Sequence, residues 1–96
     1  MFPGTTSKVS ESTLAASTTI NPKTDLVRLT GTTTIATIIP NFGGGFSGIQ
    51  YLTPVDDTVT VDTSGNVLVG QTMALNRVYT FIYSKIQAKW YIHAVA

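Results

Sequence analysis

Short runs of alternating β-branched and polar residues recur along most of this chain, and most of them are followed within a few residues by glycine, proline or asparagine. The clearest run is 58–62, where Val59 and Val61 alternate with threonine and aspartate. Alternation with a period of two predicts half-buried strands. The predicted strands are 18–20, 26–30, 33–39, 46–52, 58–62, 67–69, 78–83 and 89–95. A helical turn is an alternative to a strand only at 71–75. We therefore expect an all-β fold, a small antiparallel β-sandwich or barrel.

Threonine and the scarcity of charge set the character of the surface. Seventeen threonines favour sheet over helix because a branched β-carbon restricts the side chain in a helix. Only 11% of the residues are charged, against about 25% in ordinary soluble domains. Few charges must therefore cover the surface, and we expect part of the 43% that is apolar to face a partner.

Ninety-six residues predict one domain with one modest core. The absence of cysteine excludes disulfides and thiolate metal sites, so oligomerisation is the expected source of extra stability. Residues 1–17 are rich in Ser and Thr, and their apolar residues follow no regular spacing. We expect an extended N-terminal arm that becomes ordered on a neighbouring subunit. The alternative is a frayed terminus. Residues 18–96 form the predicted compact β-domain.

The chain offers little for catalysis. His93 is the only histidine, and no acid is placed in sequence to orient it as a base. The acids Asp56, Asp57 and Asp62 match no calcium-loop spacing and are typical of turns. The loop 43–45 has three glycines but lacks the Lys-Ser/Thr of a phosphate-binding loop. We therefore expect no enzymatic activity, no cofactor and no metal.

The partners that the composition excludes are nucleic acid and membrane. A stacking platform of Tyr79, Tyr83, Trp90 and Tyr91 is conceivable, but six cations and a net charge of +1 leave no basic footprint. No apolar run approaches the roughly 20 residues that span a bilayer. The first residues lack the basic and apolar regions of a signal peptide, so we expect synthesis in a cytoplasm.

The candidate contact residues lie in the predicted arm, or are apolar residues and arginines for which the sequence indicates no catalytic or ligand-binding role. Ile86 falls at the tip of a predicted hairpin, 84–88, where an apolar side chain is costly to leave in water. The two arginines are either interface anchors or residues of a solvated strand face. The predicted capsid or subunit interface consists of Phe2, Val9, Leu14, Arg28, Arg77, Ile86 and Trp90.

Several segments together resemble a known class of viral protein. They are 29–38, 48–52, 63–67, a strand ending at Tyr83 and the pair Trp90-Tyr91 that follows a hairpin. This pattern is similar to the β-rich domains of tailed-bacteriophage virion proteins, namely head decoration (cement) proteins, head-fibre proteins and tail-fibre segments. The hairpin before the tryptophan departs from the tight Asp-Gly turn of such domains, because 84–88 is longer and carries an apolar tip.

The resemblance implies a non-enzymatic virion component, commonly a homotrimer. The small size favours a capsid decoration protein on the shell surface, bound to the major capsid protein and to copies of itself. The alternative is a fibre-tip or carbohydrate-binding module that stacks Tyr51, Trp90 or Tyr91 on a sugar. An enzyme is the third class, and the thin inventory of acids and bases disfavours it.

Overall fold

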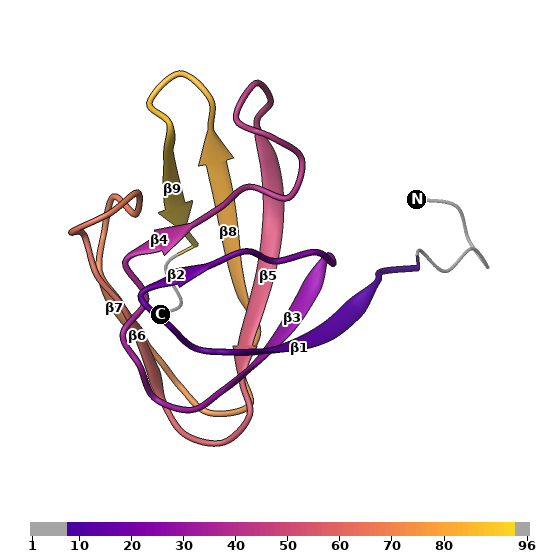
Figure 1. Ribbon diagram of the computed structural model, residues 1–96, viewed down its shortest axis with the longest axis vertical. Coiled ribbons are helices and arrows are strands. Elements are labelled where there is room, and N and C mark those ends of the chain that lie inside the picture. The colour runs from indigo at the N-terminus through magenta and orange to yellow at the C-terminus, as the bar shows by residue number, and fades with distance from the viewer. Residues whose placement is uncertain (1–7, 94–96) are drawn as a thin grey trace.

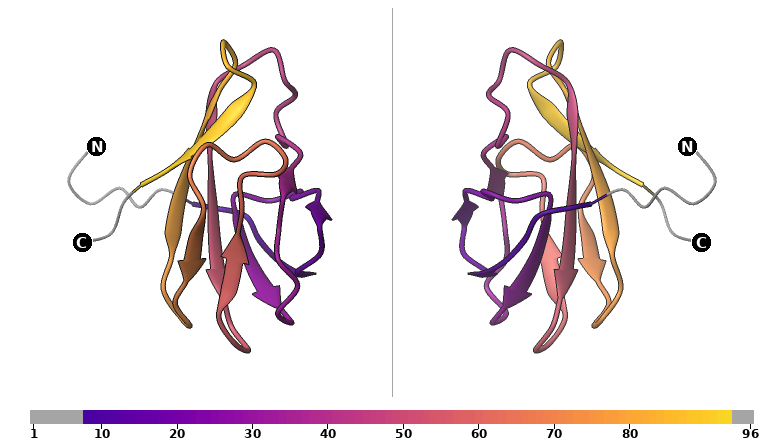
Figure 2. Two further views of the ribbon diagram at one scale, coloured as in Figure 1. Left: turned by 90° about the vertical axis from the view of Figure 1, so that its left-hand side faces the viewer. Right: turned by 90° about the vertical axis from the view of Figure 1, so that its right-hand side faces the viewer.

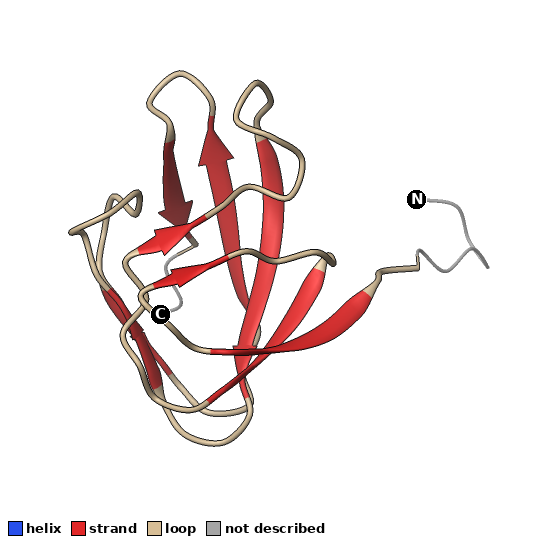
Figure 3. Ribbon diagram, in the orientation of Figure 1, coloured by secondary structure: helices blue, strands red, loops and turns tan. Residues whose placement is uncertain are grey.

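The computed structural model describes residues 8–93, which form nine strands and no helix (Figures 1 and 3). The strands are β1 (Glu11–Ala15), β2 (Thr19–Ile20), β3 (Leu26–Thr30), β4 (Thr37–Ile38), β5 (Gly48–Pro54), β6 (Val59–Val61), β7 (Gln71–Met73), β8 (Tyr79–Ser84) and β9 (Lys89–Ile92). The prediction of an all-β protein is confirmed. No helix of a kind that could cross a membrane occurs in this part of the chain.

The main sheet has five strands in the order β1-β3-β5-β8-β9, and its two halves differ in direction. β5, β8 and β9 pair antiparallel, whereas β1 with β3 and β3 with β5 pair parallel. The prediction of an antiparallel fold is therefore right for only part of the sheet. Parallel neighbours need a crossover connection, and the segments 16–25 and 31–47 provide it (Figure 1).

Two small sheets, β2–β4 and β6–β7, complete the fold. In Figure 2 the β2–β4 pair lies on the opposite side of the molecule from β8. All three sheets contribute to one core, which explains why strands of two or three residues persist. The largest fully buried side chains are Trp90, Phe81, Leu29, Ile35, Ile38, Leu52, Met73 and Gln50.

The segment 65–68 joins β9 to β4. On one side, Trp90 N–H donates to Asn66 O (2.8 Å), and Leu68 N–H donates to Trp90 O (3.0 Å). On the other, Asn66 N–H donates to Ala36 O (3.1 Å). The Asn66 side chain accepts from Ile38 N–H (2.8 Å) and donates to Ile38 O (2.7 Å). It thus makes the two hydrogen bonds that the backbone of a neighbouring strand would make. Trp90 Nε1 donates to the same Ile38 O at 2.9 Å.

Gly65 is needed for space rather than for backbone freedom. Neither Gly65 nor Asn66 has a positive φ. A β-carbon at Gly65 would collide with the carbonyl group of Ala36. The described residues that do have positive φ are Gly31, Gly43, Asn76 and Ala88.

The N-terminal region differs from the predicted division at residue 17. Glu11–Ala15 is a strand of the main sheet, paired parallel with β3 of the same chain, so this part is not an arm. Its pattern hides the strand because only Leu14 is a large apolar side chain. Residues 1–7 of the predicted arm lie outside the described residues.

Three further segments differ from their predictions. The segment 71–75 holds strand β7 and no helical turn. The long strand predicted at 33–39 is reduced to β4, because Ile35 bonds to β6 while Ala36 and Thr37 bond to Thr18 beside β2. The strand predicted at 67–69 is a single bridge from Val67 to Trp90.

Replacing Asn66 with alanine tests the junction. The change leaves the N–H of the fully buried Ile38 without a partner, and we expect unfolding free energy to fall by about 2–3 kcal/mol. Urea unfolding followed by the fluorescence of the single, buried tryptophan measures this loss. The control is Asn41→Ala in an exposed loop, which should change stability by less than about 0.5 kcal/mol. Equal effects of the two changes would contradict the assigned role of Asn66.

The turn after β6 makes stability depend on pH. Ser64 Oγ and Ser64 N–H both donate to Asp62 Oδ1 (2.6 and 3.0 Å), and these bonds hold the pKa of Asp62 below its ordinary value of 3.8. The ionised form is thus favoured in the folded state, so its stabilising effect is full above the ordinary pKa. It is lost as the pH falls through the lowered pKa.

Asp62→Ala should therefore lower the melting temperature at about pH 6, and this difference from the wild type should shrink as the pH falls below the ordinary carboxyl pKa. Thermal unfolding of both proteins across that range measures the effect. A difference that stays constant to the most acidic condition would show that the ionised carboxylate does not stabilise the turn.

Candidate interface

A row of exposed apolar side chains crosses three strands on the outer face of the main sheet. Ile49 on β5 pairs with Ile82 on β8, and Ile82 pairs with Tyr91 on β9. Residues paired in this way carry their side chains on the same face of the sheet. The exposed fractions are 51% for Ile49 and 44% for both Ile82 and Tyr91. We call these three residues the apolar row.

The apolar row crosses β8 through Ile82, which lies between Thr80 and Ser84 on the outward face of that strand. Tyr79, Phe81 and Tyr83 point into the core and are buried, so the intervening Ile82 must point outward. β8 is an interior strand of the main sheet, since it lies between β5 and β9. Both small sheets add to the core on the inner face. Among the described residues, no second layer covers the apolar row.

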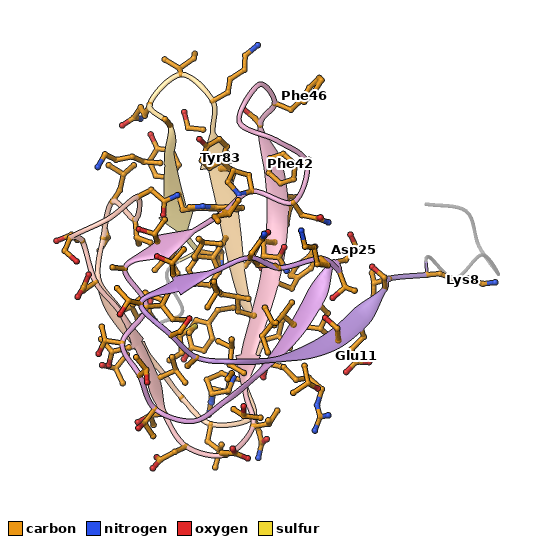
Figure 4. All side chains as sticks on the ribbon, in the orientation of Figure 1. Lys8, Glu11, Asp25, Phe42, Phe46 and Tyr83 are labelled. Carbon is orange, nitrogen blue, oxygen red and sulfur yellow. The ribbon has the colours of Figure 1, made fainter. Side chains whose placement is uncertain are left out.

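Two more exposed apolar side chains lie at one end of the molecule. Ile86 at the tip of the β8–β9 hairpin is 90% exposed, and Phe46 in the loop before β5 is 67% exposed. Lys85 N–H donates to Ser47 Oγ (3.3 Å), which holds the hairpin beside that loop. The β8–β9 hairpin and the loop before β5 lie at the top of Figure 1, and Figure 4 shows Phe46 pointing away from the molecule.

Aromatic packing fixes this end from beneath. Phe42 meets Tyr83 and Trp90 edge-on, with ring centroids 6.0 Å apart in each case (Figure 4). Tyr83 and Trp90 are 5.0 Å apart. A β-carbon at Gly48 would lie only 2.6 Å from the Phe42 ring, so glycine lets the ring sit against β5. The exposed tips therefore stand on an ordered base.

The sequence-predicted contact residues do not gather in one place. Val9 is exposed just before β1, and Arg28 is exposed on β3. Arg77 is exposed in the loop between β7 and β8. Ile86 lies at the other end of β8, at the hairpin tip. Leu14 is half-buried against the core, and Phe2 lies outside the described residues.

Trp90 corrects the prediction of a tryptophan at the interface. Its side chain is fully buried and its Nε1 is bonded to Ile38 O, so it belongs to the core. The same burial removes it as a sugar-stacking group. Ile49, Ile82 and Phe46 are exposed apolar residues that were not predicted as contact residues. For Ile82 the available signal was the aromatic and β-branched character of 78–83 on both faces.

The acids and the histidine take part in local structure. Asp56 Oδ2 accepts from Gly31 N–H (3.2 Å), and Asp57 Oδ1 accepts from Thr58 N–H (2.7 Å), which confirms their prediction as turn residues. His93 is exposed, and its backbone N–H donates to Thr80 O (2.9 Å). Residues 8–93 contain no group of three or more histidines or acids that could hold a metal ion, and no pocket.

Comparison with known proteins returns no relative. No protein-family model matches the chain, and neither curated proteins nor solved structures give a significant match.

The hairpin that presents Ile86 contains one strained residue. Ala88 has φ 56°, which disfavours any residue with a β-carbon. We expect Ala88→Gly to raise the free energy of unfolding by about 1 kcal/mol. Ala74→Gly is the control: Ala74 has no positive φ, so added freedom of the unfolded chain should cost about 0.5–1 kcal/mol there. Chemical denaturation measures both, and a destabilised Ala88→Gly would contradict the expectation.

Proposed function

We propose that this chain is a non-enzymatic structural protein of a virus particle, a capsid decoration protein that binds the surface of the assembled shell and stabilises it. The observation that carries the proposal is the apolar row, together with the exposed tips at Phe46 and Ile86. The resemblance to tailed-phage virion domains supplies the setting. The shell contact would be made with the major capsid protein.

The physics of such a contact suits this surface. Burying apolar area contributes roughly 25 cal/mol per Å², and a stable contact covers about 800 Å² on each partner. A protein that binds only the assembled shell stabilises that state by mass action. Only 11% of the residues are charged, so such a contact would bury few charges and the cost of their desolvation would be small.

For the finer fold, we propose a barrel rather than a sandwich. The segment 65–68 links the β9 edge of the main sheet to β4, and β4 pairs with β2. β2 follows β1, the opposite edge strand, after only residues 16–18. Hydrogen bonds thus run from β9 through 65–68 and β4 to β2, while only the chain segment 16–18 joins β2 to β1, so the proposed barrel is open along β1. The proposed partners also include further copies of the chain, with a trimer as the assembly that the resemblance implies.

A carbohydrate-binding module is the second candidate, and one observation favours it. Tyr91 is exposed, and its hydroxyl accepts a hydrogen bond from Gln87 Nε2, so an aromatic ring lies beside a polar side chain. Sugar sites combine these two features. Binding to a glycan array that is lost in Tyr91→Ala, without affinity for capsids, would favour this candidate over the decoration protein.

The proposed shell contact is tested by Ile82→Glu. Purified protein is added to capsids of the phage whose genome encodes this chain, prepared without it, and bound protein and shell melting temperature are measured. We expect saturable binding that raises the melting temperature, and Ile82→Glu should weaken the binding at least about tenfold, or about 1.4 kcal/mol. A charge placed in the middle of the apolar row would have to be buried unpaired.

Val69→Glu is the matched control, because Val69 is also exposed and apolar but lies outside the apolar row. Both variants should unfold at the wild-type temperature when free in solution. If the wild type does not bind the shells, or if the two variants bind equally well, the proposed contact surface is wrong.

A further inference from the structure

One edge of the main sheet is open along β1. Leu26 N–H donates to Ser10 O (2.9 Å), and Ala16 N–H donates to Thr30 O (2.8 Å), so the main-chain groups of residues 10 and 16 face β3. Along a strand, alternate residues direct these groups to the same side. The residues whose N–H and C=O groups therefore point away from the sheet are Glu11, Thr13 and Ala15.

Within residues 8–93 no hydrogen bond reaches these outward groups, and the three side chains are exposed. Natural edge strands are protected by lysine, proline, a bulge or short length. β1 has five residues in unbroken register with β3, and Glu11 is its one charged residue. Figure 4 shows Glu11 near the end of the strand, away from its middle. The edge is thus suited to pairing with another strand.

We propose that this edge pairs antiparallel with β1 of a second copy of the chain, related by a two-fold axis at Thr13. Full overlap of two five-residue strands requires the axis at the middle residue. Thr13 then lies opposite Thr13 of the second copy, and Glu11 lies opposite Ala15. All the outward N–H and C=O groups of β1 gain partners, and the two five-stranded sheets become continuous.

The strand itself favours a second copy as the occupant. In this register the two Glu11 carboxylates are separated by the length of the strand, so no like charges meet. Leu14 is half-buried on the inner face of β1 and falls opposite Ser12 of the second copy. Pairing therefore covers the exposed side of Leu14. The prediction from sequence that Leu14 lies at a subunit interface would then be met by strand pairing.

Strand pairing alone buries less area than the roughly 800 Å² per partner of a stable interface. The association is accordingly weak and reversible in dilute solution. On any surface that concentrates copies side by side, the effective concentration is high and the pairing becomes complete. This inference does not depend on the proposed shell contact, because it is tested in solution without shells, and its two-fold dimer takes the place of the trimer that the resemblance implies.

Sedimentation equilibrium of the full chain, from about 10 µM to 1 mM, tests the pairing, since a dimer grows with concentration. We expect the mass to rise from 10.2 kDa toward twice that value. Thr13→Pro removes one outward N–H and none that bonds to β3, so it should stay monomeric with a folded circular dichroism spectrum. Thr13→Val keeps the N–H and should dimerise as the wild type does.

A second pair of variants tests the register and remains informative if Thr13→Pro does not fold. Ala15→Glu places a carboxylate opposite Glu11 of the second copy and should weaken dimerisation, whereas Ala15→Lys should not. Added salt should reduce the difference between them. A wild type that is monomeric at the highest concentration, a trimer, or equal dimerisation of Ala15→Glu and Ala15→Lys would each overturn the proposal.

Discussion

The hydrogen bonds around Ile38 join the β2–β4 sheet to the main sheet of this protein. The fully buried backbone of Ile38 is bonded by the Asn66 side chain at both its N–H and its C=O, and by the indole of Trp90 at its C=O. Trp90 belongs to the main sheet and Ile38 to a two-stranded sheet that could not be stable alone. A chain with no disulfides thus closes its core with one loop residue in the place of a strand.

Much of the fold could be predicted from the sequence where alternation and burial agree. Leu26–Thr30 is observed with its predicted bounds because Val27 and Leu29 alternate with exposed or half-exposed neighbours. β1 could not be recognised in this way, since Glu11–Ala15 has one large apolar residue and depends on a partner, β3, that follows a crossover. Parallel pairing of strands far apart in the chain gives no signal in the local sequence. A hairpin such as β8–β9 does, because its two strands and its turn are adjacent in the sequence.

The candidate interface was only partly predictable, for a related reason. Ile86 was recognised because a hairpin tip cannot be buried by its own strands, and among residues 8–93 it is the most exposed of the large apolar residues. Trp90 was misplaced because a large aromatic residue suits a core and an interface equally well. The outward direction of Ile49 and Ile82 depends on which face the small sheets cover, and that is a property of the whole fold.

An apolar residue on the outer face of a central strand needs a reason of its own. The inner face of β8 already carries Tyr79, Phe81 and Tyr83, so Ile82 adds to the monomer only through its cross-strand neighbours Ile49 and Tyr91 and not through the core. The apolar row faces outward from the sheet, whereas the open edge of β1 faces along it. A domain with these two contacts can hold a surface beneath it with one and a neighbouring copy beside it with the other. The proposed role on a shell surface would use both contacts.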